Sequence, residues 1–452
     1  MRVTARLLST KALLALPLLF AAHLSFGVPI PAANLDAPLR DATELSARGG
    51  LPNVFAKLKA GDAVKIAYLG GSITEQKGWR AQSREWLQKK YPAAQISEMN
   101  AAIGGTGSDL GVFRVESDVL KHAPDLLFVE FAVNDSGVPN DRIAKAMEGI
   151  VRKTWRVLPN TDICFVYTLT AKDTAGLAAG KMKPSDSVME AVADHYAIPS
   201  IHFGLEVARL EKEGKLVMNS KDSPMTRVSG DELNAPSDMP TDSQGRILFS
   251  KDGVHPLPET GQTLYTQALT RSFERMENTG SPTPHALTEP ITIDNWELAR
   301  QIPLDQCGSL EGAVTKLEPA NEVAKQFVNR MPSMWKLEPG ATLRFKFKGT
   351  KASVYELLGP DGAKLNISVD GESREAMSFD AYSTYHRLGT LSIADKLPDT
   401  VHEVSITVLP TAPDKANILF AKNRPDLEKF PNKYAATSWY AGSIFIVGEI
   451  ID

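Results

Sequence analysis

Serine, aspartate and histidine occur at two places in this chain where their side chains could act together in nucleophilic catalysis. Ser72 follows two glycines and the apolar run 64–69. A strand buried on both faces of a parallel sheet has such a run, and α/β proteins bind ligands at the carboxyl ends of these strands. Asp252 and His255 stand three residues apart in a later segment. Because a histidine can take the serine proton while an aspartate orients the histidine, the two segments predict Ser-His-Asp hydrolysis.

Two further segments offer groups that could stabilise the oxyanion formed by such an attack. Residues 100–106 (Asn-Ala-Ala-Ile-Gly-Gly-Thr) follow the second predicted strand, and a glycine there lets a backbone N–H approach a substrate. Asn134 follows the third predicted strand and offers an amide side chain. Since the carboxyl ends of parallel strands meet at one edge of a sheet, we expect the serine, a glycine N–H and the asparagine at one site.

Taken in order, these four segments resemble the blocks of the SGNH hydrolases, also called the GDSL family. Ser72 occupies the nucleophile position, Gly105 the second-block glycine and Asn134 the third-block asparagine. Asp252 and His255 match the final Asp-x-x-His. The resemblance implies that Ser72, Asp252 and His255 are catalytic. It also implies that the N–H groups of Ser72 and Gly105 hold the oxyanion together with the Asn134 amide. Ester hydrolysis or acyl transfer without metal or cofactor follows from the resemblance, as does an α/β/α flavodoxin-like fold.

The resemblance covers roughly residues 62–278, and the chain departs from the family pattern at two positions. Gly71 stands where the family has the aspartate of Gly-Asp-Ser, which leaves the nucleophile untouched. Ala132 stands where the third block has a glycine, and its methyl group crowds the backbone beside Asn134.

Short apolar runs alternate with amphipathic stretches over the same part of the chain. This alternation is typical of a parallel sheet with helices on both faces, and right-handed crossovers then give a three-layer sandwich. The predicted strands are Val64–Leu69, Gln95–Met99, Leu126–Phe131, Ile163–Leu169 and Pro199–His202. The predicted helices are Trp79–Lys90, Leu110–Lys121, Asp141–Leu158, Ser185–His195 and Glu259–Glu277. Residues 217–249 are polar and follow neither period, so we expect a long loop there, either a cleft wall or a surface excursion.

The character of the sequence changes near residues 282–284 (Pro-Thr-Pro). Downstream, segments such as 343–347 and 401–408 alternate apolar and polar residues, as half-buried strands do. We therefore expect an SGNH hydrolase domain over residues 34–280 and an all-β, jelly-roll-like sandwich over residues 288–452. The second domain is expected to resemble a carbohydrate-binding module.

Residues 1–27 have the pattern of a cleaved secretory signal peptide, with a basic start, an apolar centre and small residues at the end. An uncleaved membrane anchor is the alternative. Removing this segment takes away three basic residues and no acidic one, so the formal net charge changes from −4 to −7. That charge, without basic runs, argues against nucleic-acid partners, and no later segment is long enough for stable membrane insertion. Two cysteines, Cys164 and Cys307, form neither a disulfide framework nor a zinc pattern.

Export, the family resemblance and the appended sandwich together predict a secreted or periplasmic esterase that removes O-acetyl groups from an acetylated glycan. Two enzymatic alternatives stay open, a lipid or aryl esterase and a polysaccharide O-acetyltransferase. Transfer differs from hydrolysis only in whether a sugar or water resolves the acyl-serine. A non-enzymatic alternative is a glycan-binding protein with an inactive hydrolase domain. The presence of Ser72, Asn134, Asp252 and His255 argues against that alternative.

Overall fold

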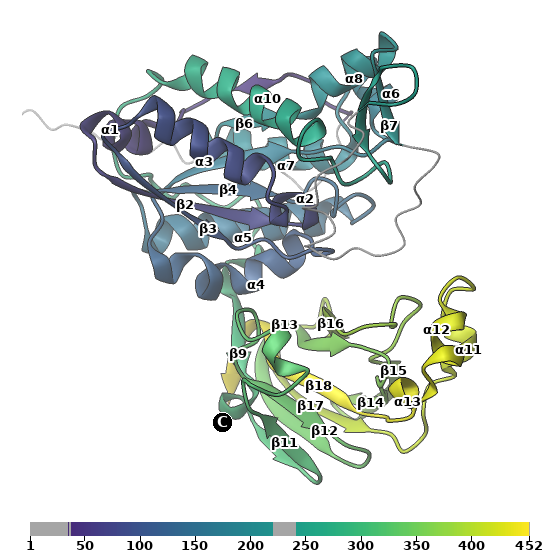
Figure 1. The fold of residues 1–452 in the computed structure, drawn as a ribbon. Helices are drawn as coiled ribbons and strands as arrows, with labels where there is room; N and C mark the ends of the chain where they lie inside the picture. The colour runs from purple at the N-terminus through teal and green to yellow at the C-terminus, as the bar shows by residue number, and fades with distance from the viewer. Residues whose placement is uncertain (1–34, 36–37, 220–240, 452) are drawn as a thin grey trace, which may run out of the picture.

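The computed structural model describes residue 35, residues 38–219 and residues 241–451 (Figure 1). Its N-terminal half is built on a six-stranded sheet with the order β1-β6-β5-β4-β2-β3. Neighbouring strands run parallel except at one edge, where β1 pairs antiparallel with β6. The strands are β1 (Leu45–Ser46), β2 (Ala63–Gly70), β3 (Gln95–Asn100), β4 (Leu126–Glu130), β5 (Asp162–Tyr167) and β6 (Ser200–His202).

Helices cover both faces of this sheet, which gives the predicted three layers (Figure 1). Successive side chains of a strand point to opposite faces. Ile66 and Tyr68 therefore pack in one buried cluster with α1, α3, α8 and α10, whereas Ala67 and Leu69 pack in a second cluster with α4, α5 and α7. The helices of this half are α1 (Pro52–Ala60), α2 (Ser72–Glu75), α3 (Trp79–Lys90), α4 (Ser108–Asp118), α5 (Asn140–Val157), α6 (Thr174–Ala178), α7 (Pro184–His195), α8 (Gly204–Lys212) and α10 (Gly261–Met276).

The predicted α/β architecture is confirmed, and each predicted strand and helix of this half corresponds to an observed element with slightly different ends. The expectation of an irregular loop over residues 217–249 is wrong at both ends. There β7 (Leu216–Asn219) and β8 (Ile247–Ser250) pair in parallel as a separate two-stranded sheet. Strands of four residues in a polar segment carry too few alternations to be recognised. Residues 220–240 of that segment lie outside the described residues.

The C-terminal half is an antiparallel ten-stranded sheet, as expected for the all-β part of the chain. Its main path is β11-β12-β18-β13-β17-β14-β15, with β9 on β18 and with β10 and β16 on β13. The strands are β9 (Ala299–Pro303), β10 (Ser309–Glu311), β11 (Val314–Leu317), β12 (Met334–Leu337), β13 (Thr342–Leu358), β14 (Lys364–Val369), β15 (Glu372–Met377), β16 (Arg387–Ala394), β17 (Thr400–Val408) and β18 (Trp439–Ile451). Three short helices that the sequence reasoning did not predict precede β18: α11 (Lys415–Ile418), α12 (Arg424–Lys429) and α13 (Pro431–Tyr434).

Strand β13 has 17 residues and pairs with different strands along its length. Its first part, residues 342–349, pairs with β17, and its last part, residues 352–358, pairs with β16. The bend between the parts is a register shift opposite β18, where Gly349 faces Gly448. A Cβ on Gly349 would come 2.1 Å from the Val447 carbonyl oxygen, so no larger residue fits there. This irregularity bends β13, and the C-terminal sheet packs around an apolar core of its own residues.

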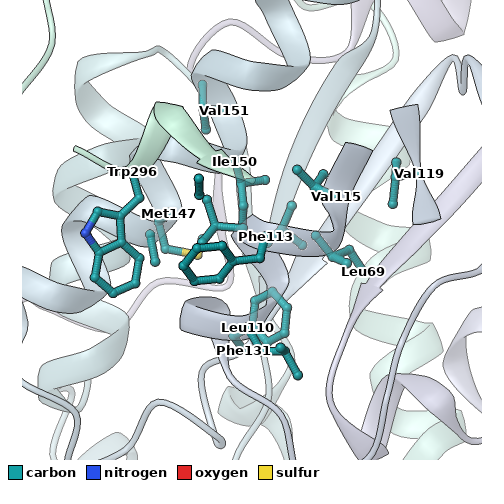
Figure 2. Packing of buried hydrophobic residues seen from close by; sticks show 14 of the residues in the cluster. Leu69, Leu110, Phe113, Val115, Val119, Phe131, Met147, Ile150, Val151 and Trp296 are labelled. Atoms are coloured by element: carbon teal, nitrogen blue, oxygen red, sulfur yellow. The ribbon is translucent and has the colours of Figure 1, made fainter. Parts of the chain in front are cut away.

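The two halves also share a hydrophobic core. Phe113 of α4 stacks on Phe445 of β18 with ring centroids 5.0 Å apart, and Phe445 stacks on Tyr355 of β13 at 5.1 Å. Figure 2 shows Trp296, from the segment between the halves, beside Phe113 and Met147. Because these rings are buried only while both halves are present, each half stabilises the other.

Helix α5 holds the segment that joins the halves. The buried Glu148 carboxylate accepts hydrogen bonds from the N–H groups of Ile291 and Thr292 at 2.5 and 3.0 Å. At the next position, a Cβ on Gly149 would come 2.7 Å from the backbone of Trp296. The joining segment therefore packs directly on the helix backbone, and its amides are satisfied by a buried carboxylate.

The predicted signal peptide, residues 1–27, lies outside the described residues. Among the residues that the structure does describe, none of the helices is both long and apolar enough to cross a membrane.

Candidate active site

Ser72 stands at the first position of α2, directly after β2 and two glycines. Neighbouring atoms leave no room for a side chain at either glycine. A Cβ on Gly70 would come 2.7 Å from the Glu130 carbonyl oxygen, and a Cβ on Gly71 would come 2.0 Å from Oδ1 of Asn134. The tight turn thus brings the serine against the ends of β2 and β4, with its side chain largely buried.

His255 and Asp252 complete a chain of hydrogen bonds that starts at this serine. Ser72 Oγ lies 2.8 Å from His255 Nε2, and His255 Nδ1 lies 2.7 Å from Asp252 Oδ2. The structure therefore brings together all three residues that the sequence predicted as catalytic. In this order the imidazole can accept the serine proton on one nitrogen while the carboxylate fixes the proton on the other. Their catalytic roles stay a prediction.

The loop after β8 is shaped to hold this pair. Asp252 Oδ1 accepts hydrogen bonds from the N–H groups of Val254 and His255, both at 2.9 Å. Gly253 takes a positive φ of 80°, and its N–H donates to Ser250 Oγ at 2.7 Å. Burial alone would raise the pKa of Asp252, but the hydrogen bonds from His255 and from the backbone N–H groups keep it below its ordinary value. The carboxylate therefore stays ionised beside the imidazole.

The predicted oxyanion donors lie close to the serine. The Asn134 amide is in contact with Gly71, the residue before Ser72. Gly105 takes a positive φ of 73°, and a Cβ there would point into open space. At the preceding residue, a Cβ on Gly104 would come 3.5 Å from the Ser72 Cβ. An N–H and an amide thus approach the serine from the ends of β3 and β4, the strands on either side of β2. Their binding of an oxyanion stays a prediction.

Three carboxyl groups near the site have no catalytic role in the prediction from sequence, and two of them, Glu130 and Asp135, are buried. Glu130 accepts hydrogen bonds from the hydroxyls of Thr74 and Thr168 at 2.8 and 2.7 Å, and its burial raises its pKa. Asp135 accepts a hydrogen bond from the Ser108 N–H at 3.0 Å, and burial raises its pKa to about 7. Glu130 thus stabilises the end of β4, and Asp135 stabilises the start of α4.

Glu75, the third carboxyl group, is partly buried and connects the two glycine-containing loops. It stands three residues after Ser72, and its Oε2 accepts a hydrogen bond from the Gly104 N–H at 2.8 Å. Burial raises the pKa of Glu75, although the Gly104 N–H and nearby arginines act in the opposite direction. No sequence motif marks this residue, because its partner is a backbone N–H of a distant loop. Within the described part of the chain, no group of histidine, cysteine and carboxylate side chains is arranged to hold a metal ion.

A sequence model of the GDSL-like lipase/acylhydrolase family matches residues 68–259, the range that contains the serine, the asparagine and the Asp-x-x-His pair. This part of the chain is a GDSL-like lipase/acylhydrolase domain. The chain is therefore a carboxylic ester hydrolase.

Two solved structures resemble nearly the whole chain, and both are of a two-domain esterase (CEX) active on acetylated mannans. One of them was co-crystallised with mannopentaose. Each is 20% identical to this chain and covers 90% of it and 98% of its own chain, with TM-scores of 0.64 and 0.63. The likeness shows that the arrangement of an α/β half followed by a β half is shared. No curated protein matches the sequence.

Proposed function

We propose that this esterase removes O-acetyl groups from a polysaccharide or oligosaccharide through an acyl-serine intermediate. The observation that carries the proposal is the hydrogen-bond chain from Ser72 through His255 to Asp252, with the Asn134 amide beside it. The glycan as substrate is supported by the two-domain likeness to an esterase active on acetylated mannans.

The reaction begins with attack of Ser72 Oγ on the acetyl carbonyl carbon. His255 Nε2 takes the hydroxyl proton as the new C–O bond forms. Asp252, ionised and hydrogen-bonded to Nδ1, holds the required tautomer and stabilises the imidazolium. The carbonyl oxygen becomes an oxyanion, to which the N–H groups of Ser72 and Gly105 and the Asn134 amide donate.

Collapse of this intermediate breaks the bond to the sugar oxygen. His255 gives its proton to that oxygen, and the sugar leaves as an alcohol. Water then attacks the acetyl-serine while His255 accepts its proton, and acetate leaves as Ser72 regains a proton. Transfer to a second sugar would use the same steps with a sugar hydroxyl in place of water.

We further propose residues 34–280 as the catalytic domain and residues 288–452 as an accessory domain that extends the glycan-binding surface. Residues 1–27 are proposed as a signal peptide that is removed on export to the periplasm or medium, on the basis of their basic, apolar and small-residue pattern. N-terminal sequencing of the exported protein tests this: a mature chain that retains residue 1 would contradict it.

Two acetate-release assays test the function. The wild-type chain should hydrolyse p-nitrophenyl acetate faster than p-nitrophenyl esters of longer acids. It should also release acetate from acetylated mannan or xylan, whereas Ser72→Ala should do neither while keeping its circular dichroism spectrum. A preference for long acyl chains would favour the lipid esterase. Loss of acetyl groups only when an acceptor sugar is added would favour the acetyltransferase.

A further inference from the structure

One arginine of the C-terminal half reaches the loop that carries Gly105. Arg330 lies between the short helix of residues 324–326 and β12. Its Nη2 donates hydrogen bonds to the backbone oxygens of Asn100 and Ala102, at 2.8 and 2.9 Å. These oxygens belong to the end of β3 and the start of the loop toward α4. The two halves of the chain therefore meet at a segment that belongs to the candidate active site.

The two carbonyl groups need a partner because β3 is an edge strand. The N–H groups of Ala101 and Ile103 donate to oxygens of β2 at 2.9 and 3.0 Å. Alternate residues of an extended chain point their backbone groups to opposite sides, so those of Asn100 and Ala102 face the open edge of the sheet. Arg330 covers this edge, and its side chain is only 23% exposed. It takes the place that another strand would occupy.

The far end of the loop is tied to the nucleophile. The Gly104 N–H donates to Glu75 Oε2 in the short helix that begins at Ser72. The loop is thus held at its start by Arg330 and at its glycines by Glu75. A shift at the Asn100 and Ala102 carbonyls would be passed to Gly105, because only a few residues separate the two anchor points.

The backbone that carries Arg330 is itself fixed in the shared core. The N–H groups of Arg330 and Met331 both donate to the Phe327 oxygen, at 2.8 and 2.7 Å. The Met331 side chain is buried against Gly442 of β18, where a Cβ would come 2.3 Å from its Cγ. The guanidinium is therefore presented from a rigid turn and not from a free surface side chain.

A second arginine binds the carbonyl that lies, in the sequence, between the two that Arg330 binds. Arg114 of α4 donates to the Ala101 oxygen at 2.6 Å and pairs with Asp118 at 2.8 Å. Asp118 also lies 3.8 Å from Arg330 Nη1. Burial and the neighbouring Arg114 lower the pKa of Arg330, while Asp118 and Glu75 act in the opposite direction. Together the two arginines bind the three consecutive carbonyl oxygens of residues 100–102.

We propose that Arg330 is a positioning residue of the esterase reaction, by which the C-terminal half fixes the loop that presents the Gly105 N–H to the oxyanion. This inference rests on the proposed function. The hydrogen bonds of the Arg330 guanidinium go to the backbone carbonyls of Asn100 and Ala102, so it acts on the loop that carries Gly105. Its loss should therefore weaken stabilisation of the transition state more than binding of the ester, so kcat should change more than KM.

The test compares Arg330→Ala with Arg374→Ala in the full-length chain. Arg374 of β15 is a matched control, because its Nη2 also donates to two backbone oxygens, those of Ser392 and Ile393 within the C-terminal half. With p-nitrophenyl acetate, Arg330→Ala should lose about 10- to 100-fold in kcat, the range for a displaced catalytic group, while KM changes much less. Added methylguanidinium should restore part of kcat to Arg330→Ala and none to wild type. Arg374→Ala should keep wild-type kcat.

Several outcomes would overturn the proposal. A folded Arg330→Ala chain with wild-type kcat would refute it, and so would a loss shared equally by Arg374→Ala or a loss that appears only in KM. If Arg330→Ala does not fold, Arg330→Lys tests the same idea. Lysine keeps the charge without the planar guanidinium, so a folded Arg330→Lys chain should have lowered kcat, and wild-type kcat would refute the proposal. Inactivity of the wild-type chain on every ester would refute the proposed function itself, which is a distinguishable result.

Discussion

The substitution Gly71→Ala tests the packing that places Asn134 beside the nucleophile. Gly71 has φ −92° and ψ −159°, a conformation open to any residue, so the backbone does not oppose alanine. The added Cβ would nevertheless lie 2.0 Å from Oδ1 and 2.8 Å from Cγ of Asn134, whereas ordinary contact begins at 3.4 Å. To restore ordinary contact, the amide must move by more than about 1 Å.

The size of the effect follows from that displacement. Moving a catalytic group by about 1 Å can cost about 10²-fold in rate, and complete loss of one oxyanion donor costs about 10²- to 10³-fold. Gly71→Ala should therefore lower kcat on p-nitrophenyl acetate by about 10²-fold with little change in KM. Because the site is overpacked, the free energy of unfolding should also fall by about 1–3 kcal/mol.

A double-mutant cycle with Asn134→Ala separates this cause from general damage to the site. Asn134→Ala alone should lose about 10²- to 10³-fold in kcat. Since the methyl group acts only through the asparagine, the double variant Gly71→Ala/Asn134→Ala should lose no more kcat than Asn134→Ala. It should also be more stable than Gly71→Ala, because the clash is gone. Steady-state kinetics and thermal unfolding of the four chains measure both quantities.

Two results would refute this reasoning. One is a folded Gly71→Ala chain with wild-type kcat and wild-type stability, which would mean that Asn134 moves aside without consequence. The other is strict additivity of the two losses in kcat, which would mean that the methyl group acts on Ser72 and not through the asparagine.

Three further predictions follow from the site, the C-terminal core and the shared core. His255→Ala should remove activity as fully as Ser72→Ala, whereas Asp252→Ala should retain more, because the aspartate transfers no proton; kcat on p-nitrophenyl acetate measures this. Burial raises the pKa of Glu356 to about 8 from its ordinary 4.5, against a hydrogen bond from Trp439. The folded chain therefore holds a proton that the unfolded chain releases, so this contribution to stability is complete below pH 4.5 and is lost as pH rises through about 8. Thermal unfolding at about pH 5 and about pH 9 measures this loss, and the Glu356→Gln chain should lack the part of it that is due to Glu356. A chain that ends near residue 285 should be insoluble or unfolded when tested by circular dichroism, because the aromatic core shared by the halves would be exposed.

Each of these has a contrary outcome. Equal residual activity in the aspartate and histidine variants would mean that the carboxylate does more than orient the imidazole. An identical pH dependence of stability in wild type and Glu356→Gln would mean that another group titrates in this window. A soluble, folded and active chain ending near residue 285 would mean that the N-terminal half is stable without its partner and does not need Arg330.

The sequence by itself determined the α/β half and the members of the candidate site. Periodicity is a local property, so the apolar run before Ser72 and the amphipathic run at residues 79–90 were enough to predict a buried strand and a helix. The order of short motifs identified Ser72, Asn134, Asp252 and His255 as one site, because each motif stands where a strand or loop ends. Asp370 and Gly371, a residue pair that favours tight turns, take positive φ between β14 and β15.

Only the tertiary structure decided which distant groups support that site. Glu75 meets the Gly104 N–H, and Arg330 meets the carbonyls of Asn100 and Ala102, through backbone atoms that leave no pattern in the sequence. The core shared by the two halves was not predicted either, since Phe113 and Phe445 are more than 300 positions apart and each fits an ordinary apolar face. Spacing along the chain reports local geometry, whereas contacts between a backbone carbonyl and a remote side chain are fixed only when both halves are folded together.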